Sequence, residues 1–179
     1  MTRETQRSGA RPSMTDVTVW EVAAEVTDPE MPMLTLADLG VLRAAETRED
    51  GTVVVTITPT YSGCPALDEM RSDLRHKLQE AGHARVDVRT SFSPPWTTDF
   101  ISDAGRRKLA EAGIAPPAHV GPRVAGPVPL TLDPPEQVVA CPQCGARDTE
   151  VVSRFGPTAC TALRRCRACA EPFEHVKEI

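Results

Sequence analysis

The spacing of hydrophobic residues near the start of this chain predicts a short helix over residues 13–27. Val17, Trp20 and Ala24 are three and four positions apart, so they would share one helical face. Pro29 disfavours helical backbone at the residue before it, which places the end of the helix ahead of Pro29. The first element is therefore expected to bury one apolar face.

A two-residue alternation follows and predicts strands. An extended segment runs through residues 34–44, and the Asp50-Gly51 pair is typical of a tight hairpin turn. Residues 52–58 then alternate between two faces, and residues 84–92 alternate again. We expect strands in all of these places, with the first two joined as a hairpin.

A second helical pattern follows the sequence Gly63-Cys64-Pro65. Pro65 is a favourable first residue of a helix, which would place Cys64 at the N-cap position. Gly82 is a typical residue for the end of such a helix. The apolar stripe of this helix consists of Leu67, Met70, Leu74, Leu78 and Ala81.

Proline frequency divides the chain. A last helix is predicted to end at Ala112, and residues 115–136 then contain seven prolines. That composition is typical of a semi-rigid linker without a core of its own, whereas the elements before it are typical of a compact α+β domain. The predicted organisation is a disordered leader (1–12), a small α+β domain (13–114), a proline-rich linker (115–136) and a four-cysteine zinc ribbon (137–179).

Two C-x-x-C pairs define that ribbon, Cys141 with Cys144 and Cys166 with Cys169. Four cysteines at this separation are typical of a structural, tetrahedral Zn²⁺ site. Gly145 can supply the positive φ that turns backbone N–H groups toward the sulfur before it. Four thiolates also suit iron in a rubredoxin-like site, and paired disulfides are the reading without a metal.

Composition excludes several classes of function. The net charge of −5 and the 4% of aromatic residues argue against a nucleic-acid-binding protein. No apolar run has the length of a membrane span, and the polar start of the chain does not resemble a secretory signal. Together with thiols spaced for metal binding, these features indicate the reducing cytoplasm.

Cys64 stands apart from the other five cysteines. A thiol at a helix N-terminus meets unpaired N–H groups and the positive end of the helix dipole, both of which favour thiolate. The alternative is a buried thiol packed under a turn. Asp38, expected at the end of a strand, is either a neighbour of Cys64 or a carboxylate that stabilises its own turn.

The remaining candidates are less specific. Cys160 lies between the two C-x-x-C pairs and is expected to be a thiol packed inside the ribbon. His175 is expected either at the surface or as an additional ligand, and the basic cluster of Arg164, Arg165 and Arg167 is expected to be solvated. None of these residues has catalytic spacing to a partner, so the residues alone do not indicate a reaction.

Four short motifs resemble the SufT-like family of iron–sulfur assembly factors. In chain order they are Asp28-Pro29-Glu30-Met31-Pro32, Asp38-Leu39-Gly40, Gly63-Cys64-Pro65 and Pro94-Pro95-Trp96-Thr97. The resemblance implies a small α+β domain whose reactive cysteine is Cys64, with Asp38 and Trp96 in the surface around it.

Further stretches resemble the PaaD family, whose members accompany phenylacetyl-CoA epoxidases. These are residues 96–99, 105–109, 113–117, 155–160 and 171–173, so the likeness extends from about residue 16 to the end. One departure is the sequence Lys177-Glu178-Ile179, where relatives can carry a further cysteine.

This resemblance implies a non-catalytic accessory component of phenylacetate catabolism. It would assist iron or iron–sulfur cluster assembly in the epoxidase catalytic subunits or in their iron–sulfur flavin reductase, with Cys64 as a transient ligand. The implied cofactors are structural Zn and a transient Fe or iron–sulfur cluster. The alternative is a docking or regulatory subunit of the same oxygenase.

Overall fold

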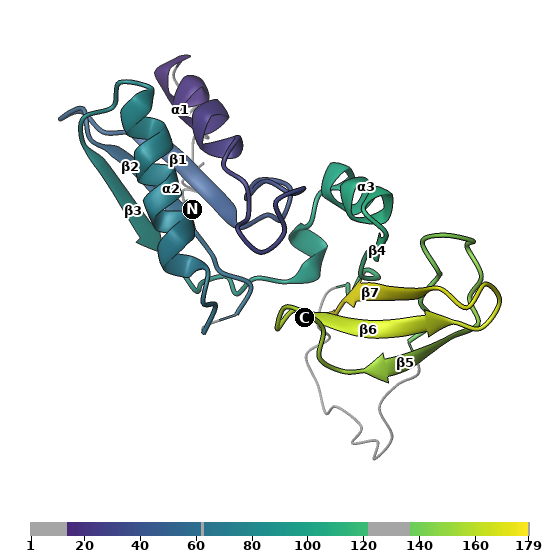
Figure 1. Cartoon of the computed structure of the whole chain (residues 1–179). Coiled ribbons are helices and arrows are strands. Elements are labelled where there is room, and N and C mark those ends of the chain that lie inside the picture. Colours follow the sequence, from purple (N-terminus) through teal and green to yellow (C-terminus); the bar gives the residue numbers. More distant parts are fainter. Residues whose placement is uncertain (1–13, 62, 122–136, 179) are drawn as a thin grey trace, which may run out of the picture.

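The computed structural model describes residues 14–61, 63–121 and 137–178. The expected leader and most of the expected linker lie outside these residues. Figure 1 shows an N-terminal body of helices and strands beside a C-terminal body made mainly of strands. Among the described residues, no helix has the length and apolar character needed to cross a lipid bilayer.

The N-terminal body is built on a three-stranded sheet in the order β1-β2-β3. β1 (Leu42–Thr47) and β2 (Val53–Ile57) form the predicted antiparallel hairpin, and Gly51 has the positive φ of 78° that its turn requires. β3 (Val86–Thr90) runs parallel to β2, so a crossover helix must join them.

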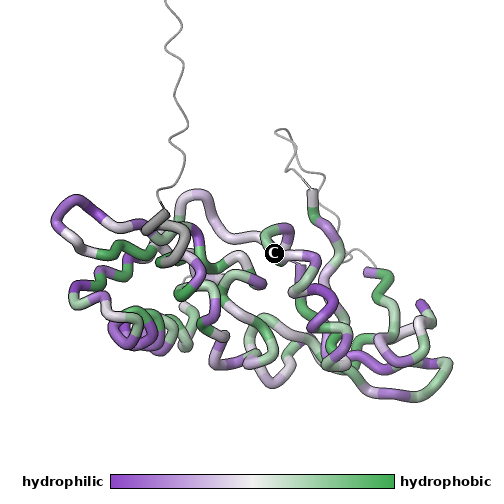
Figure 2. The backbone as a smooth tube through the Cα atoms, turned by 90° about the horizontal axis from the view of Figure 1, so that it is seen from above, coloured by the Kyte–Doolittle hydropathy of each residue, from purple (hydrophilic) through white to green (hydrophobic). Residues whose placement is uncertain are grey.

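Two helices cover one face of this sheet. α1 (Met14–Ala24) contacts β1, α2 (Leu67–Glu80) contacts β3, and the helices contact each other. The predicted stripe of α2 is buried through Met70, Leu74 and Leu78. Figure 2 shows hydrophobic and hydrophilic residues interspersed along the backbone of both bodies. Burial of that stripe fixes α2 against the sheet and positions the segment before it, which contains Cys64.

Several expected positions differ in the structure. Trp20 is 37% exposed, because α1 instead buries the face that contains Val19 and Ala23. Phe92 lies beyond the end of β3 and is 56% exposed. The expected strand over residues 34–44 is mostly turns, because hydrogen bonds within residues 34–42 close this segment on itself.

A connecting segment joins the two bodies. It consists of a short helix η1 (Thr98–Phe100) and α3 (Asp103–Glu111), whose N-cap residue Ser102 accepts a hydrogen bond from the Gly105 N–H. The predicted last helix is thereby confirmed.

The C-terminal body is a four-stranded sheet in the order β4-β7-β6-β5. β5 (Thr149–Ser153), β6 (Thr161–Cys166) and β7 (Pro172–Val176) pair antiparallel, while β4 (Ile114–Ala115) adds to β7 in parallel. The ribbon sheet therefore includes residues at the expected boundary between domain and linker.

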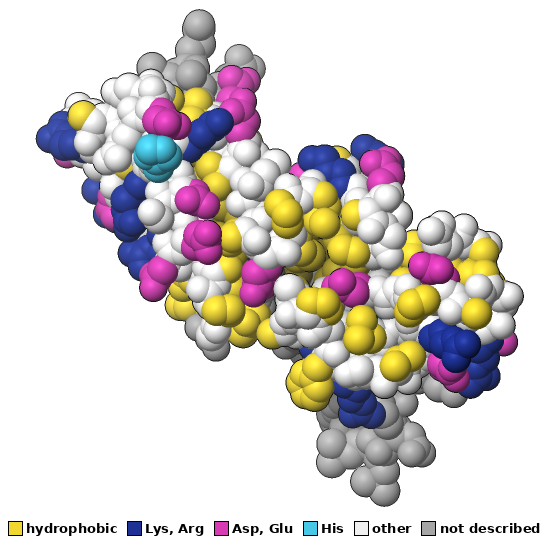
Figure 3. Space-filling view, viewed as in Figure 1, with side chains coloured by type: hydrophobic (Ala, Val, Ile, Leu, Met, Phe, Trp, Pro, Cys, Tyr) yellow, Lys and Arg dark blue, Asp and Glu magenta, His cyan; other side chains and the backbone are white. Residues whose placement is uncertain are grey.

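One hydrophobic core continues from the N-terminal body into the ribbon. Buried residues of the ribbon, Cys160 and Val176, belong to the same core cluster as Leu34, Leu74 and Trp96. Figure 3 shows hydrophobic side chains gathered along the line where the two bodies meet. A smaller second core consists of Ala115, Val139, Cys141, Cys166 and Phe173. The two bodies are therefore packed against each other through buried apolar contacts.

Candidate metal centre and cysteine site

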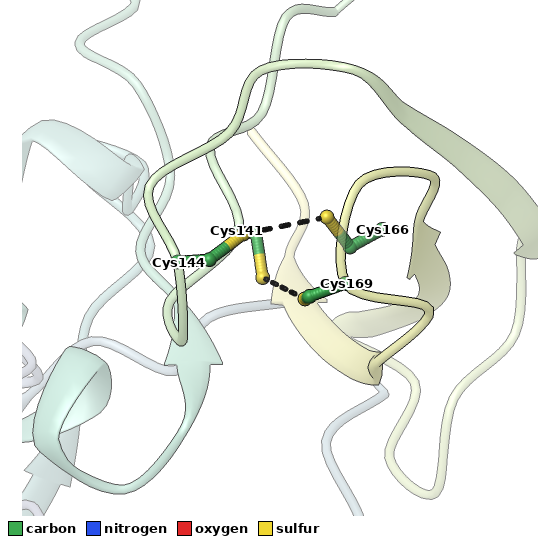
Figure 4. A group of neighbouring side chains, drawn as sticks. All are labelled: Cys141, Cys144, Cys166 and Cys169. Carbon is green, nitrogen blue, oxygen red and sulfur yellow. Dashed lines mark hydrogen bonds between the residues drawn. The ribbon is translucent and has the colours of Figure 1, made fainter.

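The four cysteines of the C-x-x-C pairs converge at one end of the ribbon. Their sulfurs all lie within 4.8 Å of one another. Figure 4 shows that one pair lies on the loop before β5 and the other on the turn between β6 and β7. The set comprises Cys141, Cys144, Cys166 and Cys169, as the spacing predicts.

The sulfur separations match a tetrahedral metal site. The Sγ atoms of Cys141 and Cys169 are 3.8 Å apart, and those of Cys144 and Cys166 are 3.6 Å apart. Ligands at the usual Zn–S distance of about 2.3 Å lie about 3.8 Å apart at the corners of a tetrahedron. The observed separations agree with that geometry, whereas disulfide-bonded sulfurs lie about 2 Å apart.

Both pairs end in the same backbone conformation. Gly145 and Ala170 directly follow the second cysteine of each pair and have φ of 73° and 64°. This left-handed conformation was predicted at Gly145, but Ala170 adopts it without the freedom of glycine. The backbone N–H groups of Cys169 and Ala168 lower the pKa of the Cys166 thiol to about 7, while at Cys169 the Glu171 N–H is outweighed by the neighbouring sulfurs, which raise the pKa of that thiol to about 12.

The centre is shielded on one side only. Cys141 and Cys166 are buried in the second core, while Cys144 and Cys169 are exposed. Four sulfur donors, half of them in a small apolar core, fit a metal ion whose role is to hold two loops together. The ribbon therefore contains a metal site.

Cys64 occupies the turn that leads into α2. The N-cap of α2 is Ala66 and the helix begins at Leu67, so the predicted N-cap position for Cys64 is wrong by two residues. Pro65 adopts no helical position, because the turn closes first through a 3.3 Å hydrogen bond from the Leu67 N–H to the Cys64 carbonyl. As a whole residue, Cys64 is only 9% exposed.

This thiol is protonated more firmly than predicted. Burial raises the pKa of Cys64, and the nearby charges of Glu30, Asp28 and Cys160 raise it further. The Ala66 N–H lowers the pKa as expected of a pre-helical turn, but burial outweighs it. Of the two readings that the sequence left open, a reactive thiolate or a buried thiol, the burial and the raised pKa favour the buried thiol.

Asp28 and Glu30 are functional candidates that the residue-by-residue analysis did not single out, although both lie in the first family motif. Asp28 is buried, and its Oδ1 accepts hydrogen bonds from the N–H groups of Glu30 at 2.9 Å and Met31 at 2.7 Å. Burial raises the pKa of both carboxyls. In addition to burial, the charges of both carboxyl groups raise the pKa of Cys64, and this influence could not be read from the spacing of the residues.

Asp38 lies in a turn and is engaged there. Its Oδ2 accepts hydrogen bonds from the Thr35 N–H at 3.0 Å, the Thr35 hydroxyl at 3.1 Å and Lys108 Nζ at 2.6 Å. Burial acts to raise the pKa of Asp38, but the Lys108 and Thr35 hydrogen bonds hold it below its usual value. These contacts match the reading of Asp38 as a carboxylate that stabilises its turn.

Trp96 secures the same turn. Its indole Nε1 donates a 2.9 Å hydrogen bond to the carbonyl of Leu39, and its ring is buried in the core that also contains Cys64. The Ser102 N–H donates to the Asp38 carbonyl at 2.8 Å. The turn at Asp38-Leu39-Gly40 and the segment around Trp96, which are the second and fourth family motifs, therefore pack against each other.

Three expectations about the ribbon need correction. Cys160 packs into the core shared with the N-terminal body instead of inside the ribbon alone. Arg164 is only 6% exposed, because its guanidinium donates to the carbonyls of Gln137 and Thr149 instead of to water. His175 is 1% exposed and lies outside the four-cysteine set; burial lowers its pKa.

Two family descriptions match the chain. Residues 16–89 match the family described as iron-sulfur cluster assembly protein, and residues 125–177 match the PaaD zinc beta ribbon domain. The first match covers α1 through β3 with Cys64, and the second contains all four clustered cysteines. The fold is therefore a SufT-like mixed helix and sheet domain followed by a zinc ribbon, as predicted.

Relatives agree with these matches. A protein of Escherichia coli K12, named as a subunit of a "Putative 1,2-phenylacetyl-CoA epoxidase", is 40% identical over 89% of this chain and 90% of its own length. A "Fe-S protein maturation auxiliary factor" of Porphyromonas gingivalis is 35% identical over 47% of this chain and 80% of its own. A crystal structure of a domain of unknown function from Bacillus anthracis aligns over 52% of this chain and 90% of its own, at 24% identity and a TM-score of 0.49.

Proposed function

This chain belongs to the PaaD family of 1,2-phenylacetyl-CoA epoxidase subunits, and from that premise we propose that it is a maturation factor of such an epoxidase system. It assists iron or iron–sulfur cluster assembly in the catalytic subunits or in their iron–sulfur flavin reductase, and it catalyses no reaction itself. The likeness of its first domain to proteins named as Fe-S maturation auxiliary factors supports this role.

The observation that carries the proposal is the environment of Cys64. A delivery ligand must bind metal and then release it, so a permanently ionised, fully coordinated thiolate would be unsuitable. Cys64 is shielded at 9% exposure, and neighbouring carboxyls add to the burial that keeps it protonated. An incoming cation displaces the thiol proton and also neutralises the adjacent negative charge, which favours binding.

The other predicted residues have supporting roles in this proposal. Asp38 stabilises its own turn through hydrogen bonds from Thr35 and Lys108. In this proposal Asp38 supports the Cys64 site through that turn and does not act as a metal ligand. The four-cysteine centre holds Zn²⁺ as a structural ion, because its donors form a closed tetrahedron. Free cysteines suit a reducing compartment, so we assign the protein to the cytoplasm.

A docking or regulatory subunit is the second candidate, and one feature of the ribbon favours it. β5 is an edge strand of the ribbon sheet. It carries Val151 and Val152 at 51% and 62% exposure, and Phe155 just beyond it is 77% exposed. An edge strand with exposed apolar residues suits contact with another protein.

The test is production of the epoxidase subunits and reductase with wild type, with Cys64→Ala or without this protein. Iron, acid-labile sulfide and phenylacetyl-CoA oxidation are then measured in the purified partners. We expect partners made with Cys64→Ala to be as poor in iron or cluster as those made without the protein.

Tyr61→Phe is the matched control, because it alters the same turn and keeps the thiol. It should leave metal content near the wild-type level. Fully loaded partners in the presence of Cys64→Ala would refute the maturation role, and stable stoichiometric co-purification would then support a docking role.

A further inference from the structure

One face of the ribbon sheet carries a cavity over its three longer strands. Successive side chains of a strand point to opposite faces, so Ala162 and Arg164 of β6 share a face and Arg165 lies on the other. The strand register sets His175 of β7 opposite Ala162, and Val151 of β5 opposite Arg164. These four residues line a cavity of about 730 Å³, a volume typical of sites for small organic molecules.

The cavity is positively charged, although the whole chain has a net charge of −5. Five Arg and Lys side chains and three Asp and Glu side chains line it, which leaves a difference of +2. None of the four clustered cysteines lines the cavity, so its chemistry is separate from that of the metal centre. The basic residues are Arg147, Arg154, Arg164, Arg167 and Lys177.

The three carboxylates of the cavity are already engaged. Asp148 and Glu150 are paired with Arg167, at N–O distances of 3.7 Å and 3.0 Å. Glu178 accepts a 3.2 Å hydrogen bond from the Ala118 N–H. Within the described part of the chain, the other four basic side chains of the cavity have no carboxylate at ion-pair distance. The excess positive charge is therefore available to a ligand.

Two buried polar groups of this cavity also favour an anion. Arg164 is 6% exposed, yet the groups to which its guanidinium donates are neutral: the carbonyls of Gln137 and Thr149 and the Thr149 hydroxyl. His175 is 1% exposed, and among the described residues its Nε2 has no hydrogen-bond partner, since Glu178 Oε1 lies 3.8 Å away. Both groups are costly to bury in this condition, and an anion in the cavity would stabilise both.

The composition of the cavity indicates the class of anion. Guanidinium groups bind phosphate through paired N–H donors, and several cations around one site suit a ligand with at least two negative charges. Apolar surface from Val138, Val151 and Ala162 adds room for an organic part, and the volume far exceeds that of one inorganic ion.

We propose that this cavity of the ribbon binds a small phosphorylated organic molecule. Arg164 is the main phosphate ligand, and Arg147, Arg154 and Lys177 add positive charge around it. Binding is non-covalent. It goes beyond the maturation role, because it requires neither Cys64 nor the four-cysteine centre.

The test is isothermal titration calorimetry of the zinc-loaded, full-length protein at low salt. The probes are adenosine diphosphate (ADP), inorganic pyrophosphate and adenosine. We expect ADP and pyrophosphate to bind with one equivalent each, more weakly as salt is added, and adenosine not to bind. Zinc content measured after each titration should be unchanged, which excludes chelation of the ribbon ion by the probe. No binding of ADP, or equal binding of adenosine, would overturn the proposal.

Arg164→Gln and Arg165→Gln form a matched pair of variants. They remove the same charge from neighbouring positions of β6, but Arg165 is exposed and does not line the cavity. We expect affinity for ADP to fall at least about tenfold in Arg164→Gln and less than about twofold in Arg165→Gln. Equal losses in the two variants would reduce the binding to non-specific attraction and overturn the proposal.

Exposed side chains keep the test valid if Arg164→Gln does not fold, which circular dichroism would show. Arg147→Gln and Arg154→Gln change exposed residues that line the cavity, so both variants should fold. Each should weaken ADP binding about twofold to fivefold, with Arg165→Gln again as the control. Unchanged affinity in both variants would show that ADP does not bind in this cavity.

Discussion

The two groups of thiols in this protein differ in how they are assembled. The four-cysteine centre comes from two short loops of one ribbon, with all sulfurs within 4.8 Å. Cys64 and Cys160 are far apart in sequence, come from different bodies and are both buried in the larger hydrophobic core. A closed, local set of four sulfurs suits an ion that remains in place, whereas a single buried thiol such as Cys64 does not complete a ligand set by itself.

The surroundings of the two groups of thiols also differ. In the ribbon, backbone N–H groups lower the pKa of Cys166 to about 7, while at Cys169 the Glu171 N–H is outweighed by the sulfurs of Cys144, Cys166 and Cys141, which raise the pKa of that thiol to about 12. Burial raises the pKa of Cys64 and of Cys160, and the charges of Glu30 and Asp28 add to it. The neighbouring sulfurs therefore divide the ribbon thiols, whereas burial is the main influence on the two isolated thiols.

The largest expected effect comes from opening the closed set with Cys166→Ser. Structural Zn²⁺ sites contribute about 10–16 kcal/mol of apparent binding free energy, so the ribbon should lose both its metal and its fold. Zinc content and circular dichroism measure this. Cys160→Ser is the matched control and should keep its zinc; loss of zinc there would make Cys160 a ligand of the ribbon centre.

A smaller effect is expected where the Asp38 turn packs beneath the N-terminal core. Gly40 has φ of 65°, and a Cβ there would lie 2.6 Å from the Cβ of Phe100. Gly40→Ala should therefore destabilise the protein by about 2–4 kcal/mol in urea unfolding. Gly82 also has a positive φ, but a Cβ there would have no neighbour within 4 Å, so Gly82→Ala should lower the stability by only about 1 kcal/mol. Equal losses of stability in the two variants would show that the close approach of Gly40 to Phe100 is unimportant.

Asp38→Asn is expected to act on stability and not on metal binding. It weakens the contact with Lys108, whose side chain is 42% exposed, so solvent screening limits the loss to about 1 kcal/mol. The folded-state pKa of Asp38 lies below its ordinary value, so its stabilisation is present above that value and disappears as pH falls through the folded pKa. Urea unfolding from pH 7 to pH 3 should show the difference in stability between wild type and Asp38→Asn becoming smaller; a difference that stays constant would contradict this role of the ionised carboxylate.

The smallest effect concerns the charge at the junction. Glu30→Gln removes a negative charge that raises the pKa of Cys64, so alkylation of this thiol should reach its half-maximal rate at a lower pH. Site-resolved iodoacetamide labelling at a series of pH values measures the direction of this shift. Glu80→Gln, on the exposed end of α2, is the control and should leave the profile unchanged. An unchanged profile for Glu30→Gln would place this carboxylate outside the site.

Prediction from sequence succeeded where one short segment carried all the information. Asp50-Gly51 indicated its hairpin, the stripe of Met70, Leu74 and Leu78 indicated α2, and the C-x-x-C spacing indicated the metal centre. It failed at Trp20 and in residues 34–44, because periodicity did not reveal which face would be covered or where a turn would close.

The chain by itself determined the ribbon centre, because two residues between cysteines constrain their sulfurs to one ion whatever the rest of the molecule does. Only the tertiary structure decided the character of Cys64. The turn before α2 directs a backbone N–H at its sulfur, but the raised pKa comes from burial and from Asp28, Glu30 and Cys160. Burial and long-range charge are properties of the packed molecule, so no local pattern could encode them.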